Sequence, residues 1–87
     1  DLMAIGLSRA CRDAGLDVPA ELSIVGFDDI FGADFATPSI TTVHSPLDDA
    51  GAAAVRSLVH TLDNSAAAPI DRLDTRLVIR ESTASIH

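Results

Sequence analysis

The stretch Leu22-Ser23-Ile24-Val25-Gly26-Phe27-Asp28-Asp29 decides the fold class of this chain. Its first six residues form a short, largely apolar run with β-branched side chains. That composition predicts a β-strand covered on both faces, and such strands are usually parallel. The apolar run stops abruptly at two aspartates. In open α/β sheets, ligands bind just beyond the carboxyl ends of the strands, so Asp28 occupies the position where a ligand-binding group is expected.

The residues before this stretch predict a helix over 2–14. Its apolar side chains recur at helical spacing, in a stripe made of Met3, Leu7, Ala10, Cys11 and Ala14. Asp1 suits the N-cap, where its carboxylate is expected to accept hydrogen bonds from the first-turn amides. Gly15 suits the left-handed position after the helix, and Val18-Pro19 prevents the helix from resuming.

The residues after the stretch predict two further strands and a second helix. Residues 40–43 and 75–80 are rich in β-branched or apolar side chains and are expected to be strands. Between them, Ser45 as N-cap and Pro46 as first helical residue begin a helix that ends near Leu62. Gly51 lies inside this helix and costs about 1 kcal/mol relative to Ala, which predicts close backbone packing there.

The predicted order is α-β-β-α-β, an α/β fragment with a parallel sheet. Three strands make a poor independent sheet, and a parallel sheet needs cover on both faces. Asp1 already stands at a helix cap, with no strand leading into it. We therefore expect residues 1–87 to be the carboxyl-terminal part of a larger domain. As an isolated monomer it should be marginally stable and should associate.

Composition narrows the possible partners. The chain has 87 residues and a net charge of -7, from 6 Lys+Arg and 13 Asp+Glu. This acidic balance argues against a nucleic-acid interface within these residues, because phosphate contacts need clustered cations. A single cysteine excludes a disulfide framework. The apolar runs are too short to span a membrane and no signal-peptide pattern is visible, so we expect a cytoplasmic protein.

Five motifs together resemble one protein family. They are Asp1-Leu-Met-Ala-Ile-Gly6, Gly15-Leu-Asp-Val-Pro19, the stretch quoted above, Pro38-Ser-Ile-Thr-Thr-Val43 and Leu77-Val-Ile-Arg-Glu-Ser-Thr83. Their order and spacing are similar to those of the effector-binding domain of LacI/GalR transcription regulators. The resemblance implies the fold of type I periplasmic sugar-binding proteins, in which two α/β lobes joined by crossover segments hold the ligand in a cleft. It also implies that about the last third of a regulator is present, without the helix-turn-helix domain that reads operator DNA.

The resemblance implies ligand-binding roles for four residues. Asp28 matches the acid that hydrogen-bonds effector hydroxyls or ring groups, a role that suits an acceptor-only carboxylate. Asp1 resembles the acid of an Asn-Asp pair that caps the cleft-facing helix, with the Asn outside this chain. Phe27 would flank the cleft with apolar cover, and Ser45 lies in the crossover after the second predicted strand.

The resemblance also implies a dimer interface at Ile5, Phe35 and Ala36. This surface could instead be core within the domain, although the helix already has another apolar stripe for that purpose. The ligand assignments have plainer alternatives too. Asp28 could be a turn acid that bonds to nearby amides, and Asp1 and Ser45 could be helix caps alone. Phe27 could simply fill the core.

The sequence contains no catalytic constellation, metal-ligand spacing or glycine-rich phosphate loop. Neither an enzyme activity, nor a cofactor, nor a metal is therefore expected. The leading hypothesis is the ligand-sensing and dimerisation part of a bacterial transcription regulator that binds a small molecule, by default a sugar. The alternative is a fragment of an extracellular sugar-binding protein of a transporter. The sequence preceding Asp1 would discriminate the two, by a helix-turn-helix or a signal peptide.

Overall fold

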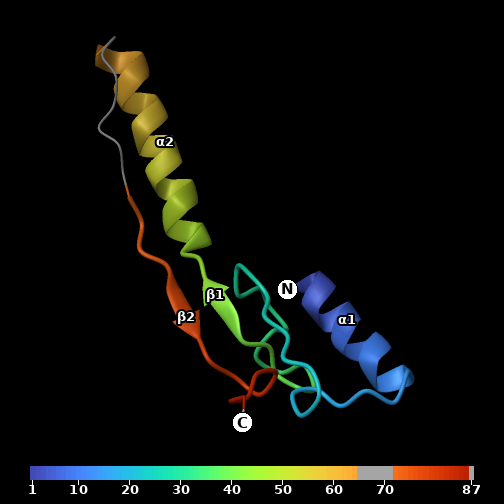
Figure 1. Ribbon diagram of the computed structural model, residues 1–87. Helices are drawn as coiled ribbons and strands as arrows, with labels where there is room; N and C mark the ends of the chain where they lie inside the picture. The colour runs from blue at the N-terminus through green and yellow to red at the C-terminus, as the bar shows by residue number, and fades with distance from the viewer. Residues whose placement is uncertain (65–71, 87) are drawn as a thin grey trace. The chain divides into compact units, whose positions relative to one another are not determined.

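The computed structural model describes residues 1–64 and 72–86. The elements follow in the order α1 (Leu2–Asp13), β1 (Thr42–His44), α2 (Leu47–Asn64) and β2 (Arg76–Val78), as Figure 1 shows. The chain forms two compact units. The first consists of Asp1–Ser45 with Arg76–His87, and the second of Pro46–Thr75. The second unit is thus inserted, in sequence, between the two strands of the first.

Helix α1 matches the predicted helix to within one residue at its end. Two hydrogen bonds close its last turn, from Leu16 N–H to the Cys11 carbonyl at 2.8 Å and from Gly15 N–H to the Arg12 carbonyl at 3.1 Å. This is the Schellman pattern, which needs a left-handed residue after the cap. Gly15 supplies it with φ +78°. The predicted role of Gly15 is therefore confirmed.

The buried face of α1 differs from the predicted stripe. The helix buries Ala4, Ser8 and Cys11, whereas Met3 is 89% exposed and Leu7 is 49% exposed. The three buried side chains are all small, and small side chains allow the helix backbone to approach the rest of the unit closely. Of the predicted stripe, only Cys11 is buried. The larger apolar side chains remain on the surface of the described chain.

The stretch 22–27, predicted as a strand, is extended but is not a regular strand. It pairs in parallel with the β1 segment at two isolated bridges, Val25 with Thr41 and Asp28 with His44. The ladder is interrupted at Ile24, because Ser82 accepts the Ile24 N–H at 2.9 Å and donates its hydroxyl to the Ile24 carbonyl at 2.6 Å. The predicted parallel direction holds at these bridges, and the predicted continuous strand is wrong.

Among the described residues, cover on both faces of this stretch is not found. Side chains alternate between the two faces of an extended segment. Ile24 is buried on one face, whereas Val25 and Phe27 on the other are each 57% exposed. Helix α1 contributes to the core on the Ile24 side, where Ala4, Cys11, Ile24, Ala33 and Ile40 form one buried cluster.

The sheet in the described residues has two strands, and it is antiparallel. Thr42 pairs with Val78, Val43 with Leu77 and His44 with Arg76. The predicted strands at 40–43 and 75–80 are therefore confirmed as shorter elements, but the expectation of a parallel sheet is not met here. Periodicity shows that a segment is extended, whereas the direction of pairing depends on how the intervening chain returns.

Helix α2 begins one residue later than predicted. The Pro46 carbonyl accepts the Ala50 N–H at 2.9 Å, so Pro46 stands at the cap position and Leu47 is the first helical residue. Close packing at Gly51 is not found, since a Cβ placed there would meet nothing within 4 Å in the described structure. Ala53 is buried, while the predicted apolar side of the helix is largely exposed at Val55, Leu58 and Leu62.

Candidate functional site: the Asp28–Asp29 turn

Two consecutive aspartates end the extended stretch in a left-handed backbone conformation. Asp28 has φ +95° and Asp29 has φ +60°. Non-glycine residues in this region cost on the order of 1–2 kcal/mol each, and such conformations gather at functional sites. Two backbone hydrogen bonds anchor the turn to the β1 segment: Asp28 N–H donates to the Val43 carbonyl at 2.9 Å, and Ser45 N–H to the Asp28 carbonyl at 3.5 Å.

Asp1 connects the start of α1 to this turn. Its carboxylate makes no cap hydrogen bond to the helix, which corrects the sequence-based expectation. Instead, Oδ2 accepts from Ile30 N–H at 2.7 Å and Oδ1 accepts from the Thr42 hydroxyl at 2.7 Å. The α-amino group of Asp1 also donates to the Phe27 carbonyl at 3.3 Å. Asp1 is thus an N-cap by position whose side chain binds the turn and β1.

Gly26 makes the approach of Asp1 possible. A Cβ at this position would collide with the Asp1 carboxylate and would lie 3.2 Å from the Asp1 Cα. Any side chain other than hydrogen would therefore push the carboxylate away from Ile30 and Thr42. The glycine in the deciding stretch is required for contact with a residue that is distant in sequence.

Asp29 is the centre of a charged cluster that the sequence reasoning missed. Its Oδ1 lies 2.8 Å from Arg80 Nη1 and its Oδ2 lies 2.9 Å from His44 Nδ1. The hydrogen bond from Arg80, followed by that from His44, lowers the pKa of the Asp29 carboxyl from its ordinary value. The sequence did contain one signal for this cluster, namely Arg80 at the end of the apolar run. An arginine in that position needs an acidic partner or contact with water.

The structure brings the four predicted ligand residues to one place. Asp1 contacts the backbone of Phe27, and Ser45 contacts the backbone of Asp28. Asp28 and Ser45 are half-buried, and Phe27 is largely exposed rather than in the core. These backbone contacts thus gather residues that carry a carboxylate, a hydroxyl and an exposed aromatic ring, which are groups that suit a polar ligand with an apolar face.

The three residues expected at a dimer interface have different environments. Ile5 and Ala36 are partly buried and pack against the core cluster. Phe35 is 64% exposed, and its ring lies edge-on to Phe31 with centroids 5.1 Å apart. Phe31 is 91% exposed. The aromatic pair, which we call the Phe31/Phe35 pair, is thus an apolar feature on the surface of the described chain.

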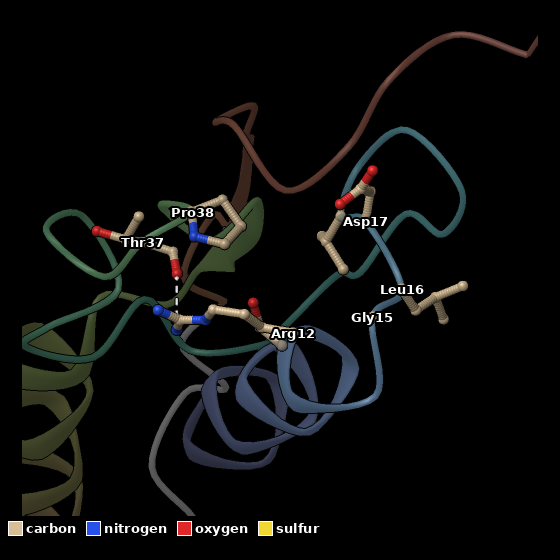
Figure 2. Close-up of a pocket in the computed structure, with 8 residues that line it drawn as sticks. Arg12, Gly15, Leu16, Asp17, Thr37 and Pro38 are labelled. Carbon is tan, nitrogen blue, oxygen red and sulfur yellow. Dashed lines mark hydrogen bonds between the residues drawn. The ribbon is translucent and has the colours of Figure 1, made fainter.

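A separate cavity of about 190 Å³ lies at the carboxyl end of α1. At the edge of this cavity, the Arg12 guanidinium donates a hydrogen bond of 3.4 Å to the Thr37 carbonyl (Figure 2). Ser8, also in its lining, has a buried hydroxyl that makes no hydrogen bond within residues 1–64 and 72–86. The volume is below the roughly 300–1,000 Å³ of most ligand pockets. The lining contains none of the predicted ligand residues; it consists of Ser8, Arg12, Gly15, Leu16, Asp17, Val18, Thr37 and Pro38.

The part of the chain that the structure describes shows neither a metal-binding group of side chains nor a membrane-spanning helix. Within it, no three His, Cys, Asp or Glu side chains are grouped so that they could hold a metal ion. None of the helices described there has the length and apolar character needed to cross a bilayer.

The chain is similar to known proteins over most of its length. Residues 1–83 match the periplasmic binding protein-like domain family. Over 86 residues the chain is 44% identical to the HTH-type transcriptional regulator MalR of Streptomyces coelicolor. That match covers 98% of this chain and 25% of MalR, so the chain spans about a quarter of the length of this relative.

Two solved regulator structures are similar to the chain. A lac repressor dimer bound to operator and the anti-inducer ONPF aligns with a TM-score of 0.88 at 32% identity, over 98% of this chain and 30% of that one. A complex of the transcriptional regulator CelR with cellobiose aligns with a TM-score of 0.83 at 34% identity, over 93% of this chain and 25% of that one. These relatives are transcription regulators rather than enzymes. The chain belongs to the periplasmic binding protein-like domain family, in the form carried by LacI/GalR-type transcription regulators.

Proposed function

We propose that the chain is the carboxyl-terminal, ligand-sensing part of the effector domain of a transcription regulator, with the effector bound at the Asp28–Asp29 turn. The observation that carries this proposal is the position of Asp28. It follows an extended stretch that pairs in parallel with β1, and its backbone is held left-handed by contacts with Val43 and Ser45. In α/β proteins, small molecules bind at the corresponding carboxyl ends of the parallel strands.

The proposed effector is a sugar. An ionised carboxylate can accept hydrogen bonds from two adjacent hydroxyls, and the exposed ring of Phe27 can cover the apolar face of a pyranose. The cellobiose complex of CelR supports this class of ligand, since that protein aligns over most of the chain. Asp1 and Ser45 contribute by holding the backbone on either side of Asp28.

In the proposed mechanism, the effector binds one arrangement of two lobes more tightly and so shifts the population of DNA-binding dimers. Operator DNA would be read by a helix-turn-helix domain outside this chain, in the cytoplasm. The Phe31/Phe35 pair would lie at the interface with a second copy, together with the surface around Ile5 and Ala36. The relatives are transcription regulators, which favours a regulatory function for this chain over a role as a component of a transporter.

Calorimetry on the full-length regulator tests the proposal, with ribose, glucose, maltose and cellobiose as probes. At least one sugar should bind, and Asp28→Ala should weaken it about 10- to 100-fold, because hydrogen bonds to a charged group contribute about 1.5–3 kcal/mol. Asp34→Ala is the matched control, since Asp34 is an exposed acid in the following loop. Unchanged affinity in Asp28→Ala would refute the site, and no heat from any of the four sugars would refute the ligand class.

A further inference from the structure

The Asp29 carboxylate contacts two segments of the first unit that lie on either side of the second unit in sequence. His44, at the end of β1, precedes the second unit, and Arg80, after β2, follows it. Both oxygens are engaged, at 2.9 Å with His44 Nδ1 and at 2.8 Å with Arg80 Nη1. Arg80 Nη1 also donates to the Ile40 carbonyl at 3.0 Å, which fixes the guanidinium on the backbone. The Asp29 and Arg80 side chains are 13% and 17% exposed, whereas His44 is 38% exposed, so the Arg80 contact is better shielded from solvent than the His44 contact.

The backbone at this point requires support. Asp28 and Asp29 both have positive φ, and a left-handed pair of non-glycine residues persists only where its surroundings hold it. The hydrogen bonds of the Asp28 backbone restrain one residue of the turn. The Asp29 side chain restrains the other, through two partners that lie on either side of the second unit in sequence, and the Ile30 N–H bond to Asp1 holds the residue that follows.

We propose that Asp29, held by Arg80 and His44, is a positioning residue that aims the Asp28 carboxylate at the effector. This inference rests on the proposed role of Asp28 in ligand binding. The three side chains need not touch the ligand. Their loss would let the turn relax toward ordinary φ values and would rotate the Asp28 side chain away from its direction in the bound state.

A second acidic side chain, Glu81, provides a matched control that separates positioning of the turn from a general loss of stability. Glu81 is adjacent to Arg80, and its Oε1 accepts from Ser39 N–H at 3.2 Å and from the Ser39 hydroxyl at 2.9 Å. The pKa of Glu81 is lowered by these hydrogen bonds, as that of Asp29 is by its own partners. Glu81 therefore makes the same number of side-chain contacts as Asp29, but it does not contact the Asp28–Asp29 turn.

The first test needs no ligand. In the full-length regulator, hydrogen exchange measured by mass spectrometry should become about tenfold faster over residues 26–30 in Asp29→Asn and in Arg80→Met. Asparagine tolerates positive φ, so Asp29→Asn removes the charge while keeping the backbone preference. Glu81→Gln should leave exchange over residues 26–30 unchanged. Exchange in Asp29→Asn equal to that of the wild type would overturn the proposal.

The second test is binding of whichever of the four sugars the wild type binds, by calorimetry. Asp29→Asn and Arg80→Met should each weaken it about tenfold, whereas Glu81→Gln should not, even where its melting temperature falls as far. The double variant should lose little more than either single one, because the two residues act as a unit. If Asp28→Ala abolishes binding and Asp29→Asn does not alter it, positioning by Asp29 is wrong. If Asp28→Ala has no effect on sugar affinity, the proposed site is wrong. In that case the hydrogen-exchange rates over residues 26–30 alone decide whether Asp29 holds the turn.

Discussion

The substitution Gly26→Ala should destabilise the protein far more than its size suggests. The added methyl group would occupy the position of the Asp1 carboxylate, which accepts hydrogen bonds from Thr42 and Ile30, both at 2.7 Å. Displacement would break at least one of these bonds and would leave the fully buried Thr42 hydroxyl without its acceptor. With about 1.5–3 kcal/mol for a hydrogen bond to a charged group, we expect a loss of about 2–4 kcal/mol.

Urea unfolding followed by circular dichroism measures this loss. Gly6→Ala is the matched control: it lies in α1, a Cβ there meets nothing within 4 Å, and it should gain about 0.5–1 kcal/mol from reduced backbone entropy. In an Asp1→Ala background, Gly26→Ala should cost much less, because the carboxylate with which it collides is gone. Equal stability of Gly26→Ala and Gly6→Ala would refute the reasoning, as would additive losses in the double variant.

Three further predictions concern acid stability, the buried hydroxyl network and assembly. The folded pKa of Asp29 lies below its ordinary value of 3.8, so the stability that this group contributes is present above that value and is lost as pH falls through the folded pKa. Between about pH 7 and about pH 3, the melting temperature should therefore fall less steeply with decreasing pH for Asp29→Asn than for the wild type. Ser82→Ala should lower the free energy of unfolding in urea by about 2–4 kcal/mol, because it removes the hydroxyl that binds the Thr41 N–H and the Ile24 carbonyl. Substitution of the exposed Ser85 by alanine should leave the free energy of unfolding unchanged. Phe35→Glu should yield monomers by light scattering with little change in melting temperature, since the ring is 64% exposed; a dimer of unchanged mass would exclude this surface as the interface.

Local signals in the sequence predicted α1 well. Its end at Gly15 depends on a backbone conformation that glycine adopts readily, and its partners lie within the last turn. The same kind of signal located the start of α2 to within one residue, through Pro46, whereas the helix ends at Asn64 and was predicted to end near Leu62. The stripe of Met3 and Leu7, in contrast, was predicted to be the packing side of α1 and is exposed. Periodicity shows that a helix has an apolar side but does not show which neighbour is present to cover it.

The candidate site was predicted in part. The position of Asp28 at the end of an extended stretch followed from the apolar run and the general geometry of α/β proteins. The charged cluster around Asp29 was missed because its members are scattered, with His44 15 residues away in sequence. The Asp1 carboxylate was assigned to the first turn of its own helix, whereas its partners are 29 and 41 residues away, at Ile30 and Thr42.

By itself, the sequence determined the helices, their ends to within one or two residues, the extended segments and the family, because each of these depends on residues close together or on a pattern along the chain. Only the tertiary structure decided that β2 runs antiparallel to β1, that position 26 needs glycine to leave room for the Asp1 carboxylate, and that Arg80 forms an ion pair with Asp29. Hydrogen bonds and ion pairs act over about 3 Å, so their partners are chosen by which segments the fold brings together. No spacing along the chain encodes that choice.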